Sequence, residues 1–240
     1  MIWLLCTWLA GAVDPAAVTS AVTETASARA QRGIAGPTIP SDAYLKAAKG
    51  QSATGLERVS GSSAKRAWGV TIVPAPISRV WAAVNDFSSR TDLTATSFAE
   101  IQTGAPCASG REVFQYLPIG VPMVSDRWWV ARLTSTPAVW KASDGRVREL
   151  VSVATDSAER LAKPQAKAMA AKGTPIAFSK GGWLLTDVDG AHTIAEFHVW
   201  SDPGGFVPAG IASSFATGGV KDNLEALQTL VRQGPSCPIK

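Results

Sequence analysis

The C-terminal quarter of the sequence most constrains the fold. Residues 193–200 alternate as a strand and lead into a turn rich in Pro and Gly, SDPGGFVPAG, at 201–210. Apolar residues then recur at spacings of three to five, which places them on one side of a long helix: Val207, Ile211, Phe215, Val220, Leu224, Leu227 and Val231. A strand that turns into a long amphipathic helix predicts a curved antiparallel sheet gripping a C-terminal helix, with a ligand cavity between them.

The other periodic segments alternate as strands more often than as helices. A strand pattern at 68–73 precedes a helical pattern at 77–85, and further strands are expected at 99–103, 111–117, 125–136, 146–154 and in a hairpin of 183–187 with 193–200. No Gly-rich phosphate loop follows a strand, and neither a βαβ alternation nor an internal repeat is present. The fold class is therefore α+β with an antiparallel sheet.

The long C-terminal helix divides at Gly218-Gly219. The half before the glycines contains mostly small residues, whereas the half after them is rich in Leu. Such a stripe is also what an ordinary core helix carries. The small residues favour a cavity at the 206–218 end, and we expect the Leu-rich half to pack tightly on the sheet.

The N-terminal region predicts export and a flexible leader. Residues 1–12 are an apolar run that ends in Ala10-Gly11-Ala12, the pattern that closes a signal peptide, although no Lys or Arg precedes the run. The alternative is a buried N-terminal segment in a cytoplasmic protein. Residues 13–63 are rich in Ala, Ser, Thr and Gly and predict a flexible leader with one short helix at 41–50. The ligand-binding domain is expected at 64–234.

Charge and cysteine content limit the partners. The net charge is +4, and the basic residues are scattered, which argues against nucleic-acid binding. Removal of the signal peptide leaves Cys107 and Cys237, which either form one disulfide in an oxidising compartment or remain two thiols.

Two stretches resemble START-type lipid-transfer domains of the helix-grip (SRPBCC) superfamily, of the bacterial exported type. In the first, Arg127 and Trp129-Val130 match an Arg-Asp-aromatic-Val strand motif, with Trp128 where the family usually has Asp. In the second, Gly182-Trp183 is followed by the Asp-Pro-Gly-Gly turn that begins at Asp202, by Pro208, and by a helix that contains NLEAL from Asn223. The resemblance covers 65–232 and is weakest over 156–180. It implies a helix-grip fold with a tunnel under the C-terminal helix for one hydrophobic molecule.

Aromatic and aliphatic residues of the sheet and the helix are the expected ligand contacts. Phe114 and Tyr116 share one face of their strand, and we place that face inward because aromatic walls suit an apolar ligand. In the last strand, Ala195, Phe197 and Val199 share the inward face. The full expected set is Phe114, Tyr116, Trp129, Trp183, Phe197, Val199, Phe206, Ile211 and Phe215.

Few polar residues suggest catalysis. Glu196 and His198 fall on the outward face of the last strand, and His192 lies beside a turn, so we assign no catalytic residue and no zinc site. No Gly-x-Ser-x-Gly elbow of a hydrolase is present. The charged group formed by Asp126, Arg127 and Arg132 would either anchor the polar end of a lipid or form a surface salt bridge.

The sequence therefore predicts a carrier of a hydrophobic small molecule, lipid or sterol-like. We expect it to be a monomer that touches a membrane transiently and uses no cofactor or metal. One alternative is an enzyme of the same fold, a cyclase or hydrolase of a polyketide-like substrate, which would need an inward acid, base or tyrosine cluster. Another is an interaction module without a cavity. The helical insertion at 156–180 is either a lid or a solvated connection.

Overall fold

A computed structural model describes residues 13–87, 93–155, 158–204, 207 and 209–239. Its strands are β1 Ala53–Arg58, β2 Lys65–Val73, β3 Phe98–Thr103, β4 Arg111–Leu117, β5 Arg127–Ser135, β6 Val147–Thr155, β7 Thr174–Pro175, β8 Phe178–Asp187 and β9 Thr193–Asp202. Its helices are α1 Pro15–Glu24, α2 Ala26–Arg29, α3 Ser41–Ala48, α4 Ile77–Asn85, α5 Pro137–Ala142, α6 Pro164–Ala170 and α7 Ala209–Gln233, with a short 3-10 turn at Ala158–Arg160.

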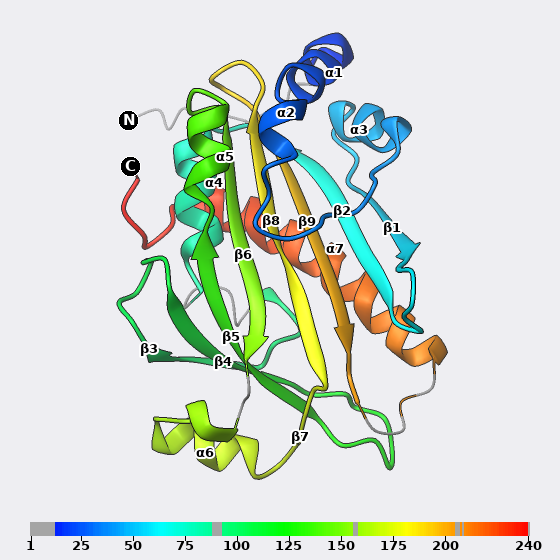
Figure 1. Cartoon of the computed structure of the whole chain (residues 1–240), viewed down its shortest axis with the longest axis vertical. Helices are drawn as coiled ribbons and strands as arrows, with labels where there is room; N and C mark the ends of the chain where they lie inside the picture. Colours follow the sequence, from blue (N-terminus) through cyan, green and yellow to red (C-terminus); the bar gives the residue numbers. More distant parts are fainter. Residues whose placement is uncertain (1–12, 88–92, 156–157, 205–206, 208, 240) are drawn as a thin grey trace, which may run out of the picture.

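The described strands form a single sheet in the order β1-β2-β9-β8-β6-β5-β4-β3, and every pair along this path is antiparallel. The small strand β7 pairs in parallel with the start of β5. Helix α7 passes behind β8, β9 and β2 in Figure 1, and α4 packs against α7 on the same side. We call the face of the sheet against α7 the helix face and the opposite one the outer face. The predicted α+β helix-grip arrangement is confirmed.

Helix α7 lies close to the sheet because β2 presents a glycine to it. A Cβ atom on Gly69 would come within 2.6 Å of a Val220 methyl and 2.8 Å of a Leu224 methyl. The expected division of the helix at Gly218-Gly219 is wrong, since α7 continues through both glycines. Helical hydrogen bonds on both sides of the pair offset the modest helix-breaking tendency of glycine.

The expectation of a flexible leader is also wrong for residues 13–58. Helices α1 and α3 pack on the outer face, where Val18 and Tyr44 join Trp68 of β2 in one buried cluster. Strand β1 pairs with β2 along its whole length. The expected short helix at 41–50 is present as α3. Alanine-rich helices carry a weak hydrophobic signal, yet their small side chains allow close packing on a sheet.

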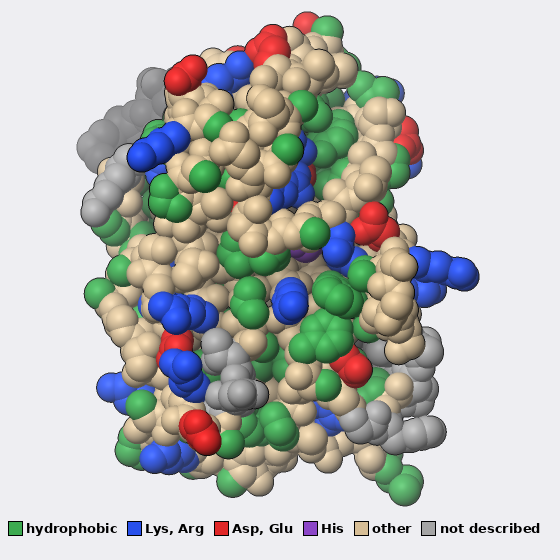
Figure 2. All heavy atoms as spheres, in the orientation of Figure 1, with side chains coloured by type: hydrophobic (Ala, Val, Ile, Leu, Met, Phe, Trp, Pro, Cys, Tyr) green, Lys and Arg blue, Asp and Glu red, His purple; other side chains and the backbone are tan. Residues whose placement is uncertain are grey.

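The insertion at 156–180 covers the outer face and not the helix face. Ala166 and Ala170 of α6 are buried against Phe114 and Trp128 in a cluster with β4 and β5. Figure 1 shows α6 on the side of the sheet that also carries α1–α3, at the opposite end. The insertion is therefore neither a lid over the helix face nor a freely solvated helix. Figure 2 shows this side with basic side chains spread among hydrophobic ones.

The C-terminal tail is fastened beside α4. Cys107, in the β3–β4 loop, forms a disulfide with Cys237, and their Cα atoms are 5.7 Å apart. The Ser236 backbone N–H donates to the carboxylate of Asp86, which follows α4, over 2.7 Å. The tail therefore holds together the end of α4 and the loop before β4.

Candidate functional site

The helix face carries an aromatic group at the centre of the sheet. Trp183 of β8 and Phe197 of β9 are directly opposed, with ring centroids 4.6 Å apart and ring planes inclined by 34°. Trp129 of β5 and Val199 of β9 pack against the same core. Trp129, Trp183, Phe197 and Val199 thus face α7.

Packing on the helix face is tight beside the C-terminal half of α7 and looser beside its N-terminal half. Along α7, Val220 and Leu224 are fully buried, whereas Ala216 is half-buried. Along β9, Ala195 is fully buried, whereas Phe197 and the residues after it on this face are half-buried. Of the other expected contacts, Phe206 lies outside the described residues, as do the side chains of Ile211 and Phe215.

Small side chains occupy the helix face around the aromatic group. The cross-strand register opposes three pairs of such residues on β5, β6, β8 and β9: Ala131–Ala154, Ser152–Gly181 and Ser179–Ser201. Side chains on one face of a sheet lie about 5 Å apart across strands, so short ones leave room above the backbone. Because the serines are half-buried, this part of the face is not sealed by α7.

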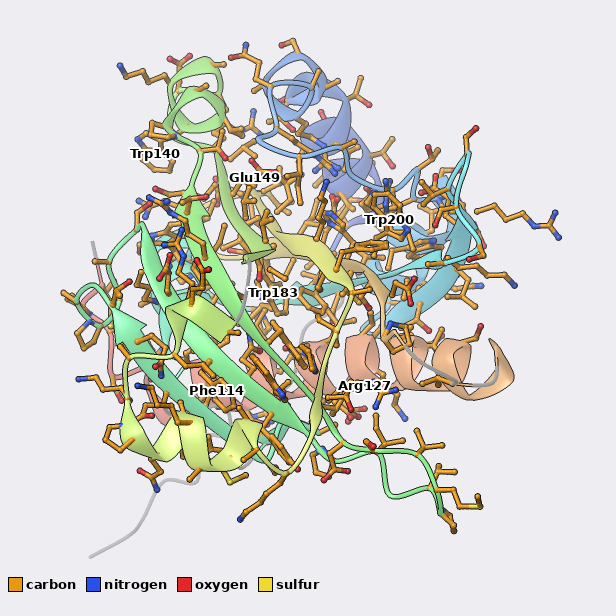
Figure 3. All side chains as sticks on the ribbon, turned by 60° about the horizontal axis from the view of Figure 1, so that its bottom comes forward. Phe114, Arg127, Trp140, Glu149, Trp183 and Trp200 are labelled. Atoms are coloured by element: carbon orange, nitrogen blue, oxygen red, sulfur yellow. A yellow bond between two sulfur atoms is a disulfide. The ribbon has the colours of Figure 1, made fainter. Side chains whose placement is uncertain are left out.

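Phe114 and Tyr116 do not face α7, which corrects the expected inward placement. Both are buried on the outer face beneath α6, and the rings of Phe114 and Trp128 have centroids 5.8 Å apart. The Tyr116 hydroxyl donates to Asp126 over 2.7 Å, and burial together with this carboxylate raises the pKa of Tyr116 to about 12. Figure 3 shows Phe114 on the strands beside α6 and Arg127 beside α7. β4 instead turns Gln115 toward α7.

Arg127 is buried and bonds to backbone carbonyl oxygens, whereas a surface ion pair was one of the two expectations. Its side chain donates to the carbonyl oxygens of Pro203 (2.6 Å) and Gly204 (2.9 Å) and also to those of Ser125 and Asp126. The guanidinium therefore ties the start of β5 to the turn that leads into α7. Arg132 is exposed on the outer face.

Arg111 is a second buried arginine, which the sequence did not single out. It is fully buried on the helix face and donates to Asn85 Oδ1 and the Asn85 carbonyl (both 3.1 Å) and to the Ala108 carbonyl (2.6 Å). Burial lowers the pKa of Arg111 to about 10. Its bonds hold the end of α4 against the β3–β4 loop. The sequence gives one sign of this placement: Arg111 lies two positions before the apolar Val113, so both side chains point to the same face of the strand.

The outer face contains a buried polar group that joins the N-terminal helices to the sheet. The Glu196 carboxylate accepts hydrogen bonds from Arg29, from Arg32 (3.2 Å) and from the Tyr44 hydroxyl (3.0 Å). Burial alone would raise the pKa of Glu196, but the two arginines hold it below its usual value. Burial, then the charges of Arg32 and Arg66, lower the pKa of His198 to about 4. The expected outward placement of Glu196 and His198 is correct, although helices cover them.

The described part of the chain contains no group of three or more His, Cys, Asp or Glu side chains that could hold a metal ion. None of its helices is long and apolar enough to cross a bilayer. His192 lies at the β8–β9 turn, where its Nδ1 is 2.9 Å from an Asp189 oxygen.

No family model matches the sequence, and no curated protein sequence matches it. Solved structures do match the fold. The STAR-related lipid transfer protein from Xanthomonas axonopodis is 20% identical with a TM-score of 0.59, over 76% of this chain and 94% of that one. Human StAR-related lipid transfer protein 5 is 15% identical with a TM-score of 0.61, over 90% and 98%. A START superfamily protein from Mycobacterium smegmatis is 11% identical with a TM-score of 0.50, over 70% and 97%.

Proposed function

We propose that this chain, which has the START-type helix-grip fold, binds and carries a hydrophobic small molecule, a lipid or sterol-like compound. The ligand would lie between the helix face and the N-terminal half of α7. The observation that carries the proposal is the set of half-buried apolar side chains there, among them Phe197, Val199 and Trp129. The Xanthomonas and human proteins that share this fold are described as lipid transfer proteins, which supports the proposal.

The binding energy would come from removing apolar ligand surface from water. A ligand that buries roughly 300 Å² gains about 7 kcal/mol at about 25 cal/mol per Å², before the entropic costs of binding. A ligand that buries only this area would bind more weakly than micromolar; micromolar affinity, about 8 kcal/mol net, needs a buried apolar area of roughly 500 Å² or more once a cost of about 4 kcal/mol is subtracted. No covalent chemistry is needed for carriage.

Saturable binding of the neutral dye Nile red, with blue-shifted emission, tests the proposal. Ser152→Leu adds bulk on the helix face, and we expect it to weaken dye binding by about tenfold or more, the equivalent of about 1.4 kcal/mol. Val153→Leu is the matched control, because Val153 is the neighbouring residue of β6 and points to the outer face. Equal dye affinity in folded Ser152→Leu and in the wild type would contradict the proposed position.

Membrane contact would occur through the β4–β5 loop. Residues 118–124 contain no charged side chain, and Met123 at its tip is fully exposed. Arg127 links the end of this loop to the Pro203–Gly204 turn before α7, so the loop lies next to the segment that leads into the N-terminal half of α7. Co-sedimentation with phosphatidylcholine vesicles should fall for Met123→Asp and not for Ile239→Asp, which alters an exposed residue of the C-terminal tail. Equal sedimentation of Met123→Asp and the wild type would exclude this loop.

We also propose that the protein is exported. The Cys107–Cys237 disulfide suits an oxidising compartment. Val13, the residue after the Ala10-Gly11-Ala12 pattern, is buried, and its backbone nitrogen contacts the Ala48 carbonyl at 3.1 Å. N-terminal sequencing of the protein from the extracytoplasmic fraction should begin at Val13. Recovery of intact protein only in the cytoplasm would refute export.

The enzyme alternative receives no support from the placement of polar residues. It needs an acid, a base or a tyrosine on the helix face. Tyr116, Glu196 and His198 all lie on the outer face. Carriage is therefore the function that the geometry favours.

A further inference from the structure

We infer that Gln115 recognises the polar group of the ligand, and that this group is an uncharged hydroxyl or carbonyl. The inference rests on the proposed function and adds to it the chemical class of the ligand. Gln115 was not among the expected contacts, because the sequence placed its neighbours Phe114 and Tyr116 inward.

Gln115 lies on the helix face within the proposed site. In the sheet register it stands between Ala99 of β3 and Trp129 of β5. Ala99 and Trp129 both pack against the core that α7 covers. The residue retains 9% of its surface exposed, so it is buried but not sealed.

The amide of Gln115 makes no side-chain hydrogen bond within the described residues. The two other buried amides there are both bonded. Asn85 donates to the Trp81 carbonyl and accepts from Arg111, and Gln102 accepts from two backbone N–H groups before α6. The Gln115 amide atoms are not among the described side-chain atoms that are sealed from solvent without a partner, so they can still be reached from outside. A ligand that excludes water here would leave the amide without a partner, which is unfavourable, unless the ligand bonds to it. A bound molecule with its own polar group would supply the missing partner.

The chemistry of the surroundings favours an uncharged group. A glutamine amide offers both a donor and an acceptor, which matches a hydroxyl or a carbonyl. The N–H groups of Arg127 are directed at four carbonyl oxygens. Those of Arg111 point to Asn85 and Ala108, and its remaining Nε has no accessible surface. Both guanidinium groups are therefore already engaged by protein oxygens, and a ligand carboxylate beside Gln115 would enter a largely apolar space.

Ligands that differ only in the polar group test this directly on the wild-type protein. Hexadecan-1-ol, hexadecanoate and hexadecane would compete with bound Nile red at pH 7.5. We expect the alcohol to displace the dye at about tenfold lower concentration than the other two, the equivalent of about 1.4 kcal/mol. A carboxylate that competes as well as the alcohol would overturn the inference. Dye that does not bind at all would instead refute the proposed function.

The variant Gln115→Leu assigns the preference to this residue. Displacement by hexadecan-1-ol is compared with displacement by hexadecane in the same variant, so the comparison does not depend on the variant's own affinity for the dye. The variant should lose the advantage of the alcohol over the alkane, because only the amide is removed. Its thermal midpoint without ligand should equal or exceed that of wild type, since the substitution removes no side-chain hydrogen bond within the described residues and adds an apolar side chain to the helix face. The control is Gln165→Leu on the exposed side of α6, which should keep the alcohol preference. Retention of the preference by Gln115→Leu would show that another group provides it.

Discussion

Arg29→Met should destabilise the fold through the carboxylate that it leaves behind. Arg29 and Glu196 have side chains only 9% and 3% exposed, and Arg29 also donates to Thr186 over 2.8 Å. Removing one member of a buried ion pair costs about 3–5 kcal/mol. Arg32 and Tyr44 remain on Glu196 at 3.2 and 3.0 Å, so we expect the lower end, about 3 kcal/mol. For a chain of this size, that corresponds to a thermal midpoint lower by about 6–12 °C.

The pH dependence of the stability lost in Arg29→Met distinguishes an unpaired Glu196 carboxylate from a simple loss of packing. In the wild type the lowered pKa of Glu196 adds stability that is present above the unfolded value and is lost as pH falls through the folded value. Without Arg29, burial dominates and raises the pKa of Glu196. The free energy of unfolding of the variant therefore falls less on acidification than that of the wild type. The difference between the two proteins, measured by urea unfolding, should therefore narrow from pH 7 to pH 4. If the difference in unfolding free energy stays constant over this range, the loss comes from packing and not from the charge of Glu196.

Three further perturbations test other parts of the structure. In the wild type, the lowered pKa of buried His198 should reduce the free energy of unfolding by up to about 3 kcal/mol between pH 6.5 and pH 4, because the unfolded state binds a proton that the folded state does not. His198→Gln should remove this loss in urea unfolding, and an unchanged pH profile would exclude His198 as its source. Cys237→Ser should lower the free energy of unfolding by about 2–4 kcal/mol relative to the oxidised wild type, since the disulfide spans 130 positions, and should match the wild type once the disulfide is reduced. Equal stability of the variant and the oxidised wild type would contradict a stabilising role of the disulfide. Gly69→Val should destabilise by about 1–3 kcal/mol in calorimetry, because its Cβ would lie 2.6 Å from Val220, and a neutral result would show that α7 moves away without cost.

Turn chemistry made much of the sheet predictable. β4 occupies 111–117 as expected, because glycine-containing turns bound it on one side and Pro118 on the other. The β8–β9 hairpin forms at Asp189-Gly190, where Asp189 Oδ1 accepts from Ala191 and His192. Local signals of this kind depend on neighbouring residues, so they can be read without knowledge of the fold.

The faces of the strands and the covering layers were harder to predict. β4 carries apolar residues on both faces, with Val113 toward α7 and Phe114 toward α6, so alternation cannot tell which face is inward. The polar group around Glu196 brings together Arg29 and Tyr44 from separate helices, which no spacing in the sequence indicates. Trp129, Trp183, Phe197 and Val199 of the candidate site face α7 as expected. Gln115 could not be identified from the sequence, because that requires knowing which face of β4 lies against α7.

One hydrophobic molecule is expected to lie between the helix face and α7. Native mass spectrometry of the mature protein, purified without detergent from cells, can detect it as bound mass. We predict a species heavier than the chain by the mass of a single lipid-like molecule, which organic extraction releases and which Ser152→Leu retains far less than Val153→Leu. A folded protein that shows only the mass of the chain, and still shows it after incubation with lipid vesicles, would contradict this expectation.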